Sequence, residues 1–450
     1  MSLWQDEAFT WARTQQSWLE LFSELPSSGN LPLFYFFNKL ITDTFSVSPF
    51  TLRVFSFLLS LLALPLAILL GKQVGNKPGM YAAAIFWAFH PMLIWYGADA
   101  KPYSLTVTLA LALLLVFLQL HEGKGSRLTW IGAIALLAAG QLSHYYFFLF
   151  AGTLCLIALI NIKRDPSFFR KWMTAWGLAS LPLIGWLFWY FSKKSPTLGA
   201  GWISQPNLTD IVGTLWNLFS GYGGVLSWPT TLLGLATATL IALSLVFRAK
   251  QRIVSPVIWF GLITPLFGMW LFSQLRPLYM DRYFIVLQPY VLLLLSSGAL
   301  ALSEQFKSSN YARQLKFGVF LIFAMVAVWA GWQVHSASHY ERENWLGLST
   351  YLVARHNPSE QIWLSDNSLR LPLAFYGVDD YNEISSELPP PCTSACWWLL
   401  RQPYTATHAF TQAISLPNRD WIPDLPANCQ KLDTWTSSTG IALFLVDCPD

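Results

Sequence analysis

The sequence predicts a mainly α-helical, polytopic membrane protein with about ten transmembrane helices and a small C-terminal α/β domain. Three observations support this fold class. Hydrophobic residues make up 54% of the 450-residue chain and charged residues only 12%, against roughly 25% charged in an ordinary soluble domain. Apolar stretches recur between residues 51 and 335, whereas residues 336–450 contain none and are richer in proline and charge.

A helix needs about 20 apolar residues to cross the hydrocarbon core, because every backbone polar group in lipid must be paired within the segment. Ten stretches come close to this length: 51–70, 79–96, 103–120, 128–143, 145–161, 172–191, 227–247, 254–273, 283–302 and 317–334. They define a predicted membrane domain at residues 51–335. Residues 1–50 precede it and are predicted to form amphipathic helices, one of them over about 8–25.

Basic residues in the connecting segments predict the orientation. Every second connection is basic, with Lys72 and Lys77, then Lys124 and Arg127, then residues 163–171, 248–252 and 307–316. Connections rich in Lys and Arg face the cytoplasm. We therefore expect a multi-pass protein of the inner (plasma) membrane whose residues 1–50 and 336–450 lie on the external side.

Residues 336–450 mix a helical pattern over 343–356 with strand-like runs such as QIWLSD, CWWLLR and IALFLVD. Four of the five cysteines lie in this domain, at Cys392, Cys396, Cys429 and Cys448. In an oxidising compartment they predict two disulfides with three possible connectivities. A metal site made of thiolates is the alternative, although it usually has a tighter paired spacing.

Ionisable residues gather at the predicted external ends of the spans. They are Asp6, Glu7, Asp99, Lys101, His144, Arg276, Asp281 and Arg282. Such groups are costly in lipid, so they tend to line a wet cavity or a functional site. The net charge of +4 is small and spread out, which argues against nucleic acid as a partner.

Several short motifs follow one another on this side of the membrane. They are WQDEAF at 4–9, NLPLFY at 30–35, WYGADAKPY at 95–103, SHYY at 143–146 and RY at 282–283. Their order resembles the GT-C superfamily of integral-membrane glycosyltransferases, in particular the bacterial branch related to protein O-mannosyltransferases and the aminoarabinose transferase of lipid A. The likeness extends to RENWLGLSTYL at 342–352.

The resemblance implies transfer of a monosaccharide from a polyprenyl-phosphate donor to a hydroxyl on the external face, with Asp6 as catalytic acid or base. Family members have a span before this loop, so we expect the natural start to lie upstream. Leu31 stands where relatives have His, and Asp99 and Lys101 stand where Glu and Arg are commoner.

The chemistry assigns roles to the remaining residues. Asp6 would take the proton of the acceptor hydroxyl, while Glu7 would position the acceptor, raise the pKa of the base or bind a cation. The leaving phosphate needs fixed cations and donors, which would be Lys101, Tyr103, Arg276, Arg282 and Tyr283. The predicted substrate contacts are Asp99, His144, Trp4 and Asn30.

Each assignment has a structural alternative. Asp6 and Glu7 suit the N-terminus of the following helix, and Asp99 with Lys101 suits a surface ion pair. Arg276 and Arg282 suit anchoring at lipid phosphates, His144 suits a bond to a neighbouring helix, and the Trp and Tyr residues suit a membrane-interface belt.

We expect no cofactor and favour a metal-independent reaction, although Asp6, Glu7 and Asp99 have the oxygen ligands that a divalent cation prefers. The sequence does not determine which sugar is transferred. It also leaves four classes of acceptor: a lipid, a polysaccharide, a carotenoid-like small molecule and a protein hydroxyl. Two other functions compete: a transporter or flippase of lipid-linked sugars, which would show internal repeats and mid-bilayer charge, and a non-catalytic GT-C-like subunit.

Overall fold

The computed structural model describes residues 2–26, 29–192, 203–221, 227–248, 256–305, 310–336, 343–365, 367–381, 395–401, 429–436 and 441–447. Three short helices open the chain: α1 (Gln5–Gln15), α2 (Trp18–Glu24) and α3 (Pro32–Thr44). The single helix expected over 8–25 is divided because the Ser17 hydroxyl accepts a hydrogen bond from the backbone N–H of Glu20 and starts a new helix.

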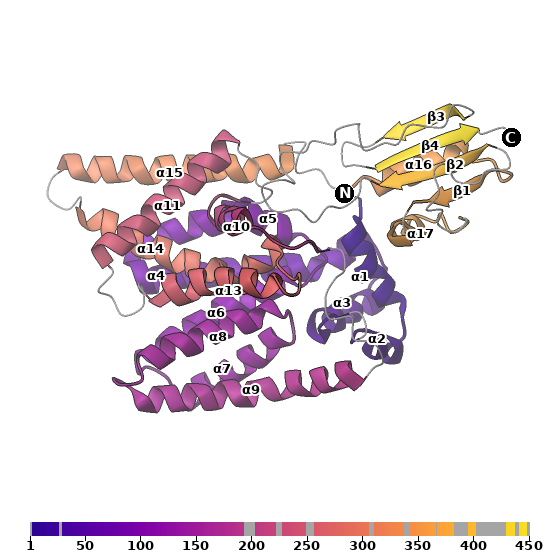
Figure 1. The fold of residues 1–450 in the computed structure, drawn as a ribbon. Coiled ribbons are helices and arrows are strands. Elements are labelled where there is room, and N and C mark those ends of the chain that lie inside the picture. Colours follow the sequence, from indigo (N-terminus) through magenta and orange to yellow (C-terminus); the bar gives the residue numbers. More distant parts are fainter. Residues whose placement is uncertain are drawn as a thin grey trace.

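A helical bundle follows (Figure 1). Its helices are α4 (Pro49–Phe89), α5 (Pro91–Gly97), α6 (Tyr103–His121), α7 (Arg127–Gln141), α8 (Tyr146–Ile160), α9 (Pro166–Ser192), α10 (Leu208–Ser220), α11 (Trp228–Arg248), η1 (Val257–Ile263), α13 (Thr264–Ser273), η2 (Asp281–Leu287), α14 (Gln288–Gln305) and α15 (Asn310–Ser336). Each of the ten predicted apolar stretches overlaps one or two of these helices. Among the described residues, five helical segments are long and apolar enough to cross a membrane.

One detail differs from the prediction. The stretch 79–96 is not one helix, because Pro91 disfavours helical backbone at His90, whose φ and ψ are −70° and 121°. The chain folds back at Asn76, where φ is +52°, within the basic connection that the sequence predicted between the stretches 51–70 and 79–96. A Cβ added at Gly71 would lie 2.5 Å from the Ala83 Cβ, whereas a straight helix would separate these positions by about 18 Å.

The middle of the bundle is formed by α14 and α6. The most apolar window of the segment Asp281–Gln305 is 94% buried, and that of α6 is 78% buried. The outer helices instead expose large apolar side chains: those of α4 include Phe57, Leu58, Leu61, Leu62 and Leu69. An apolar exterior around a packed interior is what a lipid environment stabilises, and the predicted fold class is confirmed.

The C-terminal part carries a four-stranded sheet in the order β1-β2-β4-β3 (β1 Gln361–Leu364, β2 Cys396–Arg401, β3 Gln430–Thr436, β4 Ile441–Asp447). β1 and β2 are parallel and the other pairs are antiparallel. Helix α16 (Trp345–Arg355) packs on one face through Trp345, Leu348 and Leu352; η4 (Asn367–Leu369) and α17 (Arg370–Phe375) complete the domain.

The predicted strands of this domain correspond to β1, β2 and β4, while β3 was not predicted. Its residues are mostly exposed, so the apolar pattern that marks the other strands is weak there. Cys396 and Cys429 are each disulfide-bonded. Cys392 and Cys448 lie outside the described residues, and the connectivity stays a prediction.

Candidate active site

Helix α1, which carries Asp6, lies between the helical bundle and the C-terminal sheet (Figure 1). It packs against α3 on one side and α17 on the other. Its residue Thr10 is fully buried, so the helix is embedded between two parts of the chain that are far apart in sequence.

Asp6 faces a buried arginine at the start of the central helix. The Arg282 Nη1 atom, in η2, lies 3.5 Å from the Asp6 Oδ2 atom. The Arg282 side chain is 6% exposed and that of Asp6 is 31% exposed. The carboxylate is therefore accessible to a ligand, while the cation beside it is held in a dehydrated environment, where its charge acts more strongly than in water.

Aromatic residues from two other segments lie around Tyr283, the neighbour of Arg282 in η2. The Tyr283 ring centroid lies 5.0 Å from that of His144, 5.1 Å from that of Tyr146 and 6.5 Å from that of Tyr103. The Arg282 guanidinium lies 5.8 Å from the Tyr283 ring centroid. The structure thus brings together the predicted residues Asp6, Tyr103, His144, Arg282 and Tyr283, which the chain separates widely.

The His144 imidazole, between α7 and α8, is neutral in this setting. Burial, and secondarily the positive charge of Arg282, lower the pKa of His144 from 6.5 to about 4. Since the ring carries no charge at neutral pH, it acts as a hydrogen-bonding and packing group; its Nδ1 atom accepts from the Tyr146 backbone N–H at 3.2 Å.

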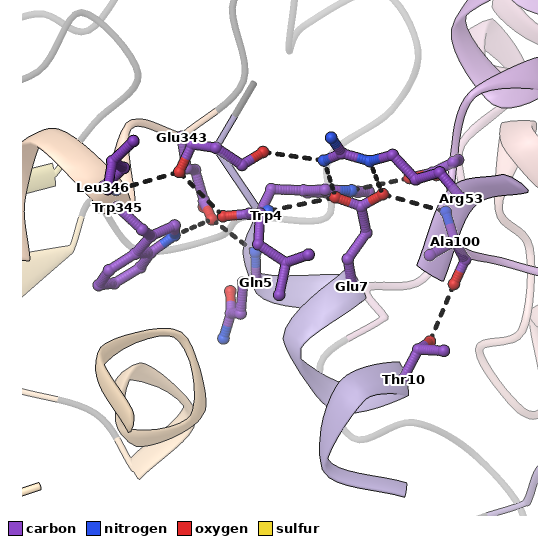
Figure 2. Close-up of polar contacts among 12 residues, drawn as sticks. Trp4, Gln5, Glu7, Thr10, Arg53, Ala100, Glu343, Trp345 and Leu346 are labelled. Carbon is purple, nitrogen blue, oxygen red and sulfur yellow. Dashed lines mark hydrogen bonds and ion pairs between the residues drawn. The ribbon is translucent and has the colours of Figure 1, made fainter. Parts of the chain in front are cut away.

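Glu7 lies on a different face of α1 and is fully buried. Arg53, in α4, donates from Nε to Glu7 Oε1 at 2.7 Å and from Nη2 to Glu7 Oε2 (Figure 2). The Glu7 carboxylate also accepts from the backbone N–H of Ala100 at 3.0 Å and of Trp4 at 3.3 Å. These contacts favour a positioning role for Glu7 over acceptor or cation binding.

Sequence reasoning missed Arg53. Its position near the start of an apolar span was the available signal, because a charged residue there needs a partner. The same guanidinium donates to the Ser2 backbone carbonyl at 2.8 Å, so Arg53 ties both the start of the chain and the first turn of α1 to the bundle.

Helix α1 also holds the segment that precedes α6. The Trp4 Nε1 atom donates to Asp99 Oδ1 at 2.8 Å, and the Thr10 hydroxyl donates to the Ala100 carbonyl at 2.9 Å. Lys101 follows directly. Within the described part of the chain, no carboxylate lies within ion-pair distance of the Lys101 ammonium, so the surface ion pair with Asp99 is not formed there.

For two of the predicted site residues, Asn30 and Arg276, the structure describes no contact with the group around Asp6 and Arg282. Asn30 accepts a hydrogen bond from the Tyr35 hydroxyl at 2.9 Å, and Tyr35 in turn accepts one from Arg13 at 3.3 Å. Arg276 is exposed in the segment after α13. Their roles in substrate binding remain predictions. Asp281 accepts from the Asn217 amide at 2.9 Å, a contact that links η2 to α10.

No group of three or more His, Cys, Asp or Glu side chains suited to a metal ion occurs among the described residues. Asp6, Glu7 and Asp99, which the sequence offered as oxygen ligands, are instead directed to Arg282, Arg53 and Trp4 respectively.

An apolar helical bundle with a buried arginine and an accessible carboxylate at one end defines an integral membrane protein with a polar site. The model of the dolichyl-phosphate-mannose-protein mannosyltransferase family matches residues 27–189, a range that extends from the segment before α3 into α9. Among curated proteins, none matches the chain in sequence.

Solved structures share the fold. ArnT from Cupriavidus metallidurans in the apo state is 11% identical, with a TM-score of 0.57 and coverage of 94% of this chain and 91% of its own. The same protein bound to undecaprenyl phosphate matches over the same shares at 11% identity and a TM-score of 0.52. The resemblance to GT-C superfamily glycosyltransferases is confirmed.

Proposed function

We propose that this protein is an inverting glycosyltransferase that moves a monosaccharide from a polyprenyl-phosphate donor to a hydroxyl acceptor on the external face of the membrane. The observation that supports this proposal most directly is the pairing of the accessible Asp6 carboxylate with the buried Arg282 guanidinium at 3.5 Å. A carboxylate that can act as a base and a cation that can bind phosphate are the two charged groups that this reaction needs within one site.

In the proposed reaction, the acceptor oxygen attacks the anomeric carbon from the face opposite the phosphate. The new carbon–oxygen bond forms as the bond to the phosphate oxygen breaks, and the leaving phosphate keeps the electron pair. Asp6 takes the proton of the acceptor hydroxyl as general base. One carboxylate suffices for a single displacement, which inverts the configuration of the sugar.

The cations of the site would stabilise the charge that develops on the phosphate. Arg282 can donate two parallel hydrogen bonds to phosphate oxygens. Its guanidinium lies 5.8 Å from the Tyr283 ring centroid, which is 6.5 Å from that of Tyr103, and both tyrosines would add hydroxyl donors. Lys101 supplies a second positive charge, since no carboxylate neutralises it among the described residues.

The donor class rests on the relatives. The matching family is described by dolichyl-phosphate-mannose, and one matching ArnT structure holds undecaprenyl phosphate. Both are polyprenyl phosphates, and an apolar bundle with Arg282 and Lys101 at its proposed site suits a ligand with a lipid tail and a charged head. The external location rests on the basic connections of the sequence.

The test is release of free polyprenyl phosphate from a panel of polyprenyl-phosphate sugars, with purified protein in lipid and a set of hydroxyl acceptors. Asp6→Asn should reduce release by at least about 100-fold, as expected for loss of a general base. Asp43→Asn is the matched control, because Asp43 is a half-exposed acid on α3 that pairs with Lys39.

The proposal is supported if Asp6→Asn abolishes release of polyprenyl phosphate and Asp43→Asn preserves it. The donor that gives release then identifies the sugar. Release unaffected by Asp6→Asn would remove Asp6 as the base. No release from any donor, together with passage of a lipid-linked sugar across vesicles, would favour the transporter instead.

A further inference from the structure

The N-terminus of α1 is only partly capped from within the helix, where the Glu7 carboxylate accepts from the Trp4 backbone N–H at 3.3 Å. Its N-cap residue is Trp4, whose side chain makes no capping hydrogen bond, whereas Ser, Thr, Asp or Asn normally fills this position. The first backbone N–H groups of a helix have no intrahelical acceptor and need partners from elsewhere. Helix α1, which carries the proposed base, therefore needs hydrogen-bond acceptors from other parts of the chain at its first turn.

The C-terminal domain supplies these partners. Glu343, which is 8% exposed, accepts a hydrogen bond from the Gln5 backbone N–H at 3.0 Å and another from the Trp345 Nε1 atom at 2.8 Å (Figure 2). The Tyr376 hydroxyl accepts from the Leu3 N–H at 2.7 Å. A carboxylate at a helix N-terminus is also favoured by the helix dipole.

Further contacts join the same two elements. The Leu346 backbone N–H donates to the Ser2 hydroxyl at 3.1 Å. The Trp11 and Phe375 rings meet edge to face, with centroids 5.3 Å apart, and Leu3 is fully buried beside Phe375 and Tyr376. On its opposite side, α1 is held by Arg53 through Glu7.

We propose that Glu343 is a positioning residue through which the C-terminal domain holds α1, and therefore Asp6, in the geometry required for transfer. This inference rests on the proposed function. Gln5 and Asp6 are adjacent. The hydrogen bond from the Gln5 backbone N–H to Glu343 therefore fixes the backbone one residue from the proposed base. Displacement of a reacting group by about 1 Å can cost about 100-fold in rate.

The domain offers a matched control. Glu360 also accepts from an indole, that of Trp397 at 2.7 Å, and from a backbone N–H, that of Asn357 at 3.1 Å. Its described contacts lie within the C-terminal domain. Glu343→Ala and Glu360→Ala therefore remove the same kind of hydrogen-bonding group from one domain, and only the first touches α1.

The experiment compares kcat and KM for the donor with hydrogen exchange of a peptide covering residues 2–12, using the full-length protein in lipid. Glu343→Ala should lower kcat by about 10- to 100-fold with donor KM changed less than about threefold, and should speed exchange in this peptide. Glu343→Gln, whose amide oxygen can still accept from Gln5, should recover most of the rate. Glu360→Ala should leave kcat and the α1 exchange unchanged.

Equal effects of Glu343→Ala and Glu360→Ala on kcat and on exchange would overturn the inference, because a general loss of domain stability would then explain both. Unchanged exchange in residues 2–12 of Glu343→Ala would overturn it as well. Failure of the proposed function is distinguishable: the wild-type protein would show no transfer, while the exchange comparison would still decide whether Glu343 holds α1.

Discussion

Arg53 and Glu7 form a buried two-point ion pair in which the Nε and Nη2 atoms of the guanidinium each donate to one oxygen of the carboxylate. The Glu7 side chain is inaccessible to solvent and that of Arg53 is 12% exposed. Because the pair joins the first turn of α1 to the first turns of α4, it fixes the helix of the proposed base against the bundle. A surface ion pair would not hold two elements this firmly.

We expect Arg53→Met to lower the melting temperature strongly. It leaves the buried Glu7 carboxylate without its cation, and breaking such a pair typically costs about 3–5 kcal/mol. Arg53→Lys should recover little, because an ammonium cannot reproduce the two parallel hydrogen bonds. Lys124→Met, which breaks an exposed pair with Glu122, should cost less than about 1 kcal/mol. Equal melting temperatures for all variants would contradict the structural role of Arg53.

We expect Arg282 to act mainly on the chemical step. Arg282→Met should lower kcat by about 100-fold or more, since preorganised charge at the leaving group is usually the largest catalytic contribution. Arg282→Lys keeps the positive charge but loses the two parallel hydrogen bonds of the guanidinium, so its kcat should lie between those of Arg282→Met and the wild type. Steady-state rates with saturating donor measure both. Arg355→Met, in the exposed pair with Asp433, is the control, and a similar loss in all three variants would refute a local role.

We expect His144 to make the protein sensitive to acid. Its pKa falls from 6.5 to about 4 on folding, so between these values the unfolded chain binds a proton that the folded protein does not. The free energy of unfolding should therefore be highest above pH 6.5 and should decrease as the pH falls toward 4. His144→Gln should show a flatter pH dependence of the melting temperature across this window. Identical pH profiles would show that another group dominates.

We expect transfer to proceed without a divalent cation. The acidic side chains of the site are directed to Arg282, Arg53 and Trp4, and Arg282 with Lys101 can supply the positive charge that a metal would otherwise bring. A chelator should leave the initial rate unchanged within about twofold. A loss of rate that added Mg²⁺ or Mn²⁺ restores would overturn this expectation.

Sequence alone determined the helical bundle, for a physical reason. A backbone surrounded by lipid has to pair its polar groups within the segment, so apolar runs of sufficient length mark helices. Each of the ten predicted stretches overlaps at least one helix of the described residues. The turn at Asn76 falls in the basic connection that the sequence predicted between the stretches 51–70 and 79–96. The break after Phe89 was not predicted, because Pro91 interrupts an otherwise apolar stretch.

The sequence also indicated Asp6, Tyr103, His144, Arg282 and Tyr283 as one group, because they lie at the same predicted ends of successive spans. Only the tertiary structure decided which carboxylate is accessible and which is enclosed. Adjacent residues of α1 point to different sides, so Asp6 faces Arg282 while Glu7 faces Arg53. The bond between Glu343 and Gln5 has no local sequence signal, since it forms only when the two ends of the chain dock, and docking depends on packing between segments that the sequence separates.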